Sequence, residues 1–152
     1  MHPSLRATLV LVAALATAAS LWLVPAQAAT PAERYAAAAV SATNARRAEH
    51  DLAALGDSRC LQRFANRWAR HMARTGSLSH QDLGPIMRRC GLSSAGENIA
   101  WGYPTGRAAV RGWMHSEGHR ANILNPRFRL VAIGAARDGD GGWWTSQVLG
   151  RR

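Results

Sequence analysis

The chain has 152 residues, 47% of them hydrophobic, which suits a single domain with one core. Its 19 basic residues are all arginine and its acids number only 9, so the formal net charge is +10. This surplus favours contact with anionic polymers or membranes, although codon bias in a GC-rich genome would also produce it. No run of clustered arginines is interleaved with aromatic residues, so we expect no specific nucleic-acid partner.

The N-terminal stretch has the features of a secretory leader. Arg6 supplies a positive start, residues 9–24 are apolar and uncharged, and Ala26-Gln27-Ala28 is a small-x-small cleavage site. We therefore predict a signal peptide over residues 1–28 and a secreted, monomeric domain over residues 29–152. A retained membrane anchor is the alternative, but the apolar run is short for a bilayer and no basic cluster follows it.

The only two cysteines are Cys60 and Cys90. In an oxidising compartment an even pair is most simply one disulfide, and closing this loop is worth about 3.7 kcal/mol by the chain-entropy relation. Two free structural thiols are the alternative. A thiol nucleophile is less favoured, because neither cysteine has a recognisable Cys-His context.

The first helix is predicted over Ala32–Ala48, an alanine-rich run that follows a capping hydroxyl at Thr30 and a proline at position 31. Asn44 and Arg47 share one face near its end. They form either a solvated face or a structural bond to a neighbouring loop, and both interpretations remain open.

A second helix is predicted after Asp57 or Ser58, either of which can cap it, and it ends at Gly76. One apolar stripe recurs at helical spacing, namely Leu61, Phe64, Ala65, Trp68, Met72 and Ala73. His80 follows the helix end, and a lone histidine is usually structural. We expect a long loop over residues 81–95, of a length typical of functional loops.

Glu97 lies at the start of a short extended run, residues 96–102. Thr105 then caps a third helix that leads into the stretch Trp113–Pro126, where imidazoles and carboxylates alternate with large apolar residues. Such a mixture is typical of the wall of a polar pocket, which places His115, Glu117 and His119 on the side facing water or a ligand.

The C-terminal part predicts a hairpin. Residues 129–137 alternate in polarity, a glycine-rich turn follows, and residues 143–149 form the return strand. Helices before and among a few strands predict an α+β fold.

Short motifs are distributed along the whole mature chain. They are Asn44-Ala45-Arg46-Arg47, Leu55 to Leu61, Trp68-Ala69 with Met72-Ala73, Ser79-His80, Gly96-Glu97-Asn98-Ile99-Ala100, Trp113-Met114 with Ser116, Gly118 to Leu124, and Gln147 to Gly150. Each motif alone is weak, but together they span about Tyr35 to Gly150. In this order they resemble the CAP superfamily (cysteine-rich secretory, antigen 5 and pathogenesis-related 1 proteins), in its bacterial SCP-like branch.

The resemblance implies an α-β-α sandwich, with a small antiparallel sheet between helical layers, and a cavity lined by two His and two Glu. His80 and Glu97 match the first His and first Glu. Ser116 stands where animal and plant members have the second Glu, and Trp144 stands where they have the second His. We infer that His119 enters the cavity from another direction, with Glu117 as its carboxylate partner.

Two chemistries remain open for this cavity. His80 and His119 could bind a divalent metal such as zinc, with carboxylates and an open position completing the site. The alternative, which we favour, is a buried polar network in which each Glu fixes a His by hydrogen bonds and no cofactor is required.

The function that the sequence favours is non-enzymatic. Members of the family are linked with sterol, lipid and cell-envelope interactions, so we expect an extracellular binding module for a lipid, a sterol or an anionic envelope polymer. The alternative is a metal-dependent or Ser/His hydrolase acting on peptides. Ser116 beside His119 and Glu117 has suitable residue types for it, but no nucleophile elbow or oxyanion loop surrounds Ser116.

Overall fold

The computed structural model describes residues 28–152, so the predicted leader, residues 1–28, lies outside the described part except for its last residue. Among the described residues, no helix combines the length and apolar character needed to cross a bilayer.

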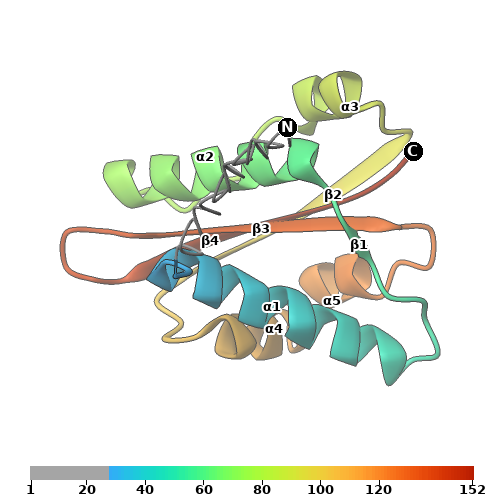
Figure 1. Cartoon of the computed structure of the whole chain (residues 1–152), viewed down its shortest axis with the longest axis horizontal. Coiled ribbons are helices and arrows are strands. Elements are labelled where there is room, and N and C mark those ends of the chain that lie inside the picture. Colours follow the sequence, from blue (N-terminus) through green and yellow to red (C-terminus); the bar gives the residue numbers. More distant parts are fainter. Residues whose placement is uncertain (1–27) are drawn as a thin grey trace, which may run out of the picture.

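In the described part of the chain, five helices enclose a four-stranded sheet (Figure 1). The elements in chain order are α1 (Pro31–Ala48), β1 (Gly56–Asp57), α2 (Arg59–Thr75), α3 (Leu83–Cys90), β2 (Ser94–Trp101), α4 (Gly106–Met114), α5 (Glu117–Ile123), β3 (Leu130–Arg137) and β4 (Trp143–Arg151). Helices α2 and α3 cover one face of the sheet, and α1, α4 and α5 cover the other. The predicted α+β sandwich is confirmed.

The sheet has the strand order β1-β3-β4-β2. Strand β4 pairs antiparallel with both β2 and β3, which includes the predicted hairpin. The sheet is nevertheless mixed rather than purely antiparallel, because the connector before α2 adds the two-residue strand β1 parallel to β3. This strand ends at once, since the next residue, Ser58, already caps α2 with its hydroxyl.

The helix boundaries follow the capping signals. Thr30 and Glu33 form a reciprocal capping box at the start of α1, and Gly76 ends α2 with a left-handed φ of 63°. The prediction of a structureless loop over residues 81–95 was wrong, because Asp82 caps the short helix α3 there. Its two turns are too short to give a clear apolar period in the sequence.

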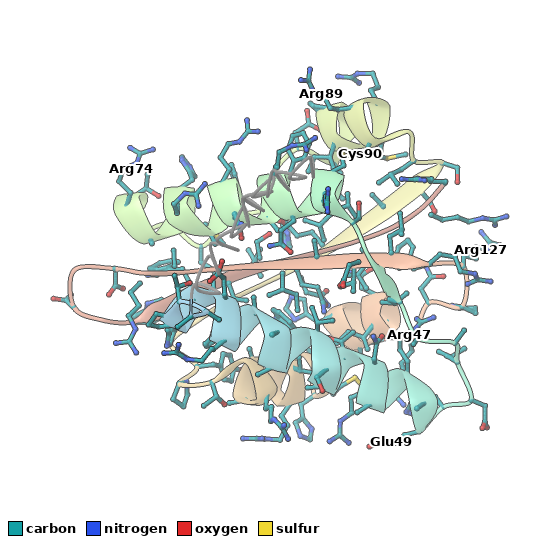
Figure 2. The ribbon with its side chains drawn as sticks, viewed as in Figure 1. Arg47, Glu49, Arg74, Arg89, Cys90 and Arg127 are labelled. Carbon is teal, nitrogen blue, oxygen red and sulfur yellow. A yellow bond between two sulfur atoms is a disulfide. The ribbon has the colours of Figure 1, made fainter. Side chains whose placement is uncertain are left out.

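Asn44 and Arg47 make the structural bonds to a neighbouring loop. The Asn44 amide donates to the carbonyl of Leu55 at 3.1 Å and accepts from its N–H at 2.9 Å. Arg47 is 1% exposed, and its guanidinium donates to the carbonyls of Ala53, Ile123 and Asn125 at 2.8 to 2.9 Å. Burial, with a smaller effect from the Arg129 charge, lowers the pKa of Arg47. One buried side chain, labelled in Figure 2, thus joins α1, the loop before β1 and the end of α5.

We expect Arg47→Ala to lower the free energy of unfolding by about 3 kcal/mol, because it leaves three carbonyls without their charged donor. Urea unfolding measures the change. The neighbouring Arg46→Ala is the control, since Arg46 makes only an exposed pair with Glu49 and should change stability by less than about 0.5 kcal/mol. Equal effects of the two variants would contradict the structural role of Arg47.

The predicted disulfide is present between Cys60 at the start of α2 and Cys90 at the end of α3, with a Cα–Cα distance of 5.8 Å. It holds α3 and the segment around His80 against α2.

A free-thiol assay on denatured, unreduced protein should therefore detect no thiol. The double variant Cys60→Ser/Cys90→Ser should lose up to about 3.7 kcal/mol of unfolding free energy, because the unfolded chain regains the freedom of the closed loop. Two reactive thiols in the unreduced protein would refute the bond.

Candidate functional site

His80 and Glu97 meet at the surface although they are 17 residues apart. His80 lies in the segment between α2 and α3, and Glu97 lies in β2. The Nδ1 atom of His80 is 2.8 Å from Oε2 of Glu97. The carboxylate side chain is 2% exposed and the imidazole is 58% exposed, so a buried acid supports an accessible ring.

The Glu97 carboxylate is saturated by hydrogen bonds. Its Oε2 accepts from the backbone N–H of Gln81 at 3.1 Å in addition to its contact with His80. Its Oε1 accepts from Nε2 of Gln81 at 2.6 Å and from Oγ of Ser146 at 2.8 Å. Burying a carboxylate is costly unless its oxygens are satisfied, and here both are.

The contact with Glu97 determines which ring nitrogen of His80 is left for solvent or a ligand. Because Nδ1 points at a carboxylate, the proton sits on Nδ1 when the ring is neutral, and Nε2 carries the free lone pair. His80 therefore offers an oriented acceptor, or a ligand atom, on a ring that is more than half exposed.

A buried amide network continues from this pair through the sheet. Asn98 Nδ2 donates to Oε1 of Gln147, its partner on β4, at 2.8 Å, and to the carbonyl of His119 at 3.1 Å. Asn122 Nδ2 donates to Oδ1 of Asn98 and to the carbonyl of Glu97. Gln147 Nε2 reaches Oγ1 of Thr43 on α1 at 2.8 Å. The network links β2, β4, α1 and α5, and so fixes the backbone on both sides of Glu97.

His119 lies on α5 and is half-buried. Burial lowers the pKa of His119, and the nearby His80 lowers it further. The carbonyl of His119 accepts from the amide of Asn98, the residue after Glu97 in β2, so α5 lies beside the strand that carries Glu97. His119 favours its neutral form at pH 7.

Ser116 lies at the junction of α4 and α5, and Glu117 is the first residue of α5. The backbone N–H of Ser116 bonds to the carbonyl of Trp113 at the end of α4, and its side chain makes no capping bond to α5. Glu117 is exposed and lines a separate hollow of about 490 Å³ with Arg120 and Arg127. The bonds that connect the described residues bring together His80 and Glu97, but not Ser116 and Glu117.

The residue types at the site fit a metal only partly. His80 offers a free Nε2, and His119 is nearby, but both oxygens of Glu97 already accept two hydrogen bonds each. Within residues 28–152, no group of three or more His, Cys, Asp or Glu side chains is arranged to hold an ion. A zinc site needs at least three protein ligands, so these residues do not complete one.

Several residues of the site were not singled out from the sequence. Gln81 and Ser146 hold Glu97, and neither belongs to a pattern that spacing alone reveals. Trp144, which stands where related proteins have a second histidine, is buried and donates its indole N–H to Asp138 at 2.7 Å. At the position of that second histidine, this chain therefore has a tryptophan that bonds to the hairpin turn.

The chain matches a known protein family and a bacterial relative. The chain matches the family model "CAP: Cysteine-rich secretory protein family" over residues 40–148. It is 36% identical over 119 residues to the Bacillus subtilis (strain 168) protein YkwD, covering 74% of this chain and 46% of YkwD. The chain therefore spans about half the length of this relative.

Solved structures of bacterial proteins share the fold. An extracellular protein containing an SCP domain from Bacillus anthracis aligns with a TM-score of 0.70 and 28% identity, covering 84% of this chain and 45% of that one. An outer surface protein of Borrelia burgdorferi aligns with a TM-score of 0.66 and 18% identity, covering 74% and 89%. The family match, the fold and the paired His80 and Glu97 together lead to one conclusion: this chain belongs to the CAP, or cysteine-rich secretory protein, family.

Proposed function

We propose that this chain is a secreted, non-enzymatic binding module that contacts a lipid, sterol or cell-envelope ligand at the face formed by His80, Glu97 and His119. The observation that carries the proposal is the saturated Glu97 carboxylate beneath an exposed imidazole. A carboxylate with four hydrogen-bond partners orients its neighbour and has little capacity left to accept a proton from a substrate. Relatives described as extracellular or outer surface proteins support an extracellular setting.

The hydrolase alternative requires a nucleophile activated by a base. In the Ser-His-acid arrangement the imidazole lies between the hydroxyl and the carboxylate. Here the carboxylate lies in the middle, because Ser146 and His80 both bond to Glu97 rather than to each other. Ser146 is also fully buried. Ser116 makes no hydrogen bond to His119 among residues 28–152, so neither serine forms an activated pair. These contacts favour binding over acyl transfer.

An uncharged polar group of a ligand suits this site. When its ring is neutral, His80 offers Nε2 as an acceptor, and the lowered pKa of His119 favours a neutral ring there at pH 7. A hydroxyl of a sterol, a lipid or a sugar can donate to such an acceptor. A metal site is less well supported than a hydrogen-bonding site, since no third ligand is arranged beside His80 and His119 among the described residues.

We expect His80→Ala to weaken retention on isolated cell-wall sacculi, or on vesicles with sterol, by at least about fivefold, because one oriented acceptor is lost. Co-sedimentation measures retention. The exposed His50→Ala is the matched control and should bind as the wild type does. If wild type binds and His80→Ala binds equally well, this face is not the site.

If purified protein cleaves peptides and Ser116→Ala abolishes cleavage, the hydrolase alternative replaces the proposal.

Stability should fall as the pH drops from about 7.5 to 5.5. The folded state holds the pKa of His119 below 6.5, so the unfolded chain takes up the proton first and acid favours unfolding. The contribution is complete above the unfolded pKa and is lost as the pH falls toward the folded one. Thermal melts across this range should show a smaller pH dependence for His119→Gln than for wild type, whereas His50→Gln should keep the wild-type slope. Parallel curves for wild type and His119→Gln would contradict the shift.

A further inference from the structure

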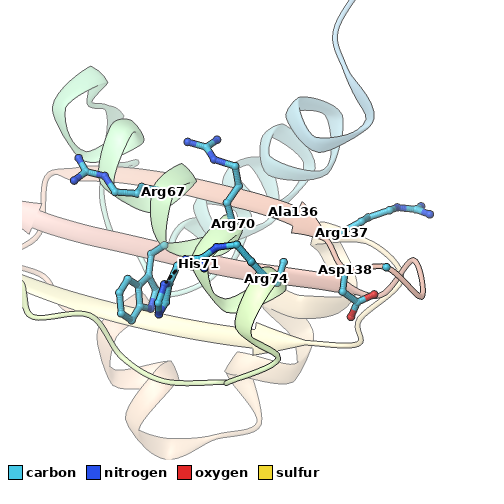
Figure 3. Close-up of a pocket in the computed structure, with 10 residues that line it drawn as sticks. Arg67, Arg70, His71, Arg74, Ala136, Arg137 and Asp138 are labelled. Atoms are coloured by element: carbon cyan, nitrogen blue, oxygen red, sulfur yellow. Dashed lines mark hydrogen bonds between the residues drawn. The ribbon is translucent and has the colours of Figure 1, made fainter.

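An arginine-lined groove lies between α2 and the end of the β3–β4 hairpin, and the site described above does not use it. It has a volume of about 720 Å³. Arg67, Arg70 and Arg74 line it from α2, and Arg137 lines it from the end of β3 (Figure 3). We call these four residues the arginine groove. The fold thereby gathers arginines that are up to 70 positions apart in the chain.

The positive charge of this groove is not neutralised within the described part of the chain. The ion pairs found there are Arg46 with Glu49 and His80 with Glu97, so none involves the arginine groove. Asp138 also lines the groove, but its Oδ2 accepts from the indole of Trp144 at 2.7 Å and its Oδ1 accepts from the Gly142 amide at 2.7 Å. These bonds hold the pKa of Asp138 below its usual range and direct its oxygens at the hairpin turn. Four arginines therefore line the groove together with one acid, whose oxygens are already bonded to Trp144 and Gly142.

Two of the arginines are held in place by aromatic rings. The guanidinium of Arg67 lies 5.1 Å from the ring centre of Phe64, and that of Arg137 lies 4.6 Å from the ring centre of Trp143. Such stacking leaves the N–H groups at the guanidinium edge free for a ligand and reduces the entropy lost on binding.

The aromatic rings beside these arginines already stack on other side chains. Phe64 and Trp143 are covered by arginines, and Trp68 is stacked on His71 with ring centres 4.6 Å apart. Binding of single-stranded nucleic acid depends on stacking platforms in addition to charge. The groove therefore favours an anion without bases.

The arrangement of the arginines indicates more than one anionic group. Figure 3 shows Arg67 and Arg137 at opposite sides of the groove with Arg70 between them, their side chains pointing in different directions. Guanidinium groups that point in different directions favour a ligand with several charged groups over a single small anion. Guanidinium forks match phosphate oxygens in bidentate geometry. A flat bilayer fits a concave site poorly, so a flexible chain is the better occupant.

We propose that the arginine groove binds a linear chain of phosphate groups, such as a phosphodiester or polyphosphate polymer without bases. This inference rests on the proposed function only for its extracellular setting, because the groove residues differ from His80, Glu97 and His119. Each arginine bonds phosphate oxygens along the chain, and the counterions released from the polymer add to the affinity.

The test is binding of long-chain inorganic polyphosphate to the full chain, measured by calorimetry at several salt concentrations. We expect Arg70→Gln/Arg74→Gln/Arg137→Gln to bind at least about tenfold more weakly, with the slope of log K against log salt reduced by about two. The control Arg107→Gln/Arg111→Gln/Arg127→Gln removes equal charge from exposed positions elsewhere and should change affinity less than about threefold. Thermal melts verify that both triple variants are folded.

Four outcomes would overturn the inference. They are no binding of polyphosphate by wild type at low salt, equal losses in both triple variants, tighter binding of an oligothymidylate of equal charge, and binding only to vesicles containing phosphatidylglycerol. His80→Ala should bind polyphosphate as wild type does. If His80→Ala loses envelope retention while the groove variant keeps polyphosphate binding, the groove is excluded and the proposed function stands. The reverse pattern removes the His80 site and leaves the groove.

Discussion

The buried hydrogen-bond network through β2 and β4 is the constraint on which the rest of the structure depends. Asn98 on β2 and Gln147 on β4 face each other in register, and their amides reach both α5 and Thr43 of α1. Polar groups in such a core cost stability unless every one is paired, and none of the buried side-chain polar atoms in residues 28–152 lacks a partner. A shift of one strand by one residue would leave several of them unpaired, so the network fixes the register that presents Glu97 to His80.

The fixed position of Glu97 determines what His80 can offer to a ligand. Glu97 is held by Gln81 and Ser146, so its negative charge is directed toward His80 rather than toward solvent. The disulfide between Cys60 and Cys90 restrains α3 at the far end of the segment that carries His80 and Gln81. An exposed ring on a rigid support suits recognition of a ligand, because little conformational entropy is lost when the ligand binds.

The arginines of this chain have different structural roles, which its composition does not distinguish. Arg47 and Arg70 both belong to one surplus of positive charge, yet Arg47 is buried and bonds three carbonyls, whereas Arg70 is exposed in a groove. The sequence shows no run of arginines interleaved with aromatic residues. The fold brings Arg137 of the hairpin into the lining of the groove beside α2, while the Trp143 ring on which its guanidinium stacks packs against Tyr35 of α1.

Local signals in the sequence determined most of the helices and strands, the disulfide and the family. Capping residues and apolar periods act over short distances, and the chain has only two cysteines to pair. Thr30, Ser58 and Gly76 delimit the first two long helices as predicted. The sequence did not determine the short elements α3 and β1, nor the partners of Glu97, since Gln81 and Ser146 come from distant segments. Likewise, whether Asn44 and Arg47 were solvated or structural depended on carbonyls up to 78 residues away. Such contacts exist only after the chain has packed, so only the tertiary structure decided them.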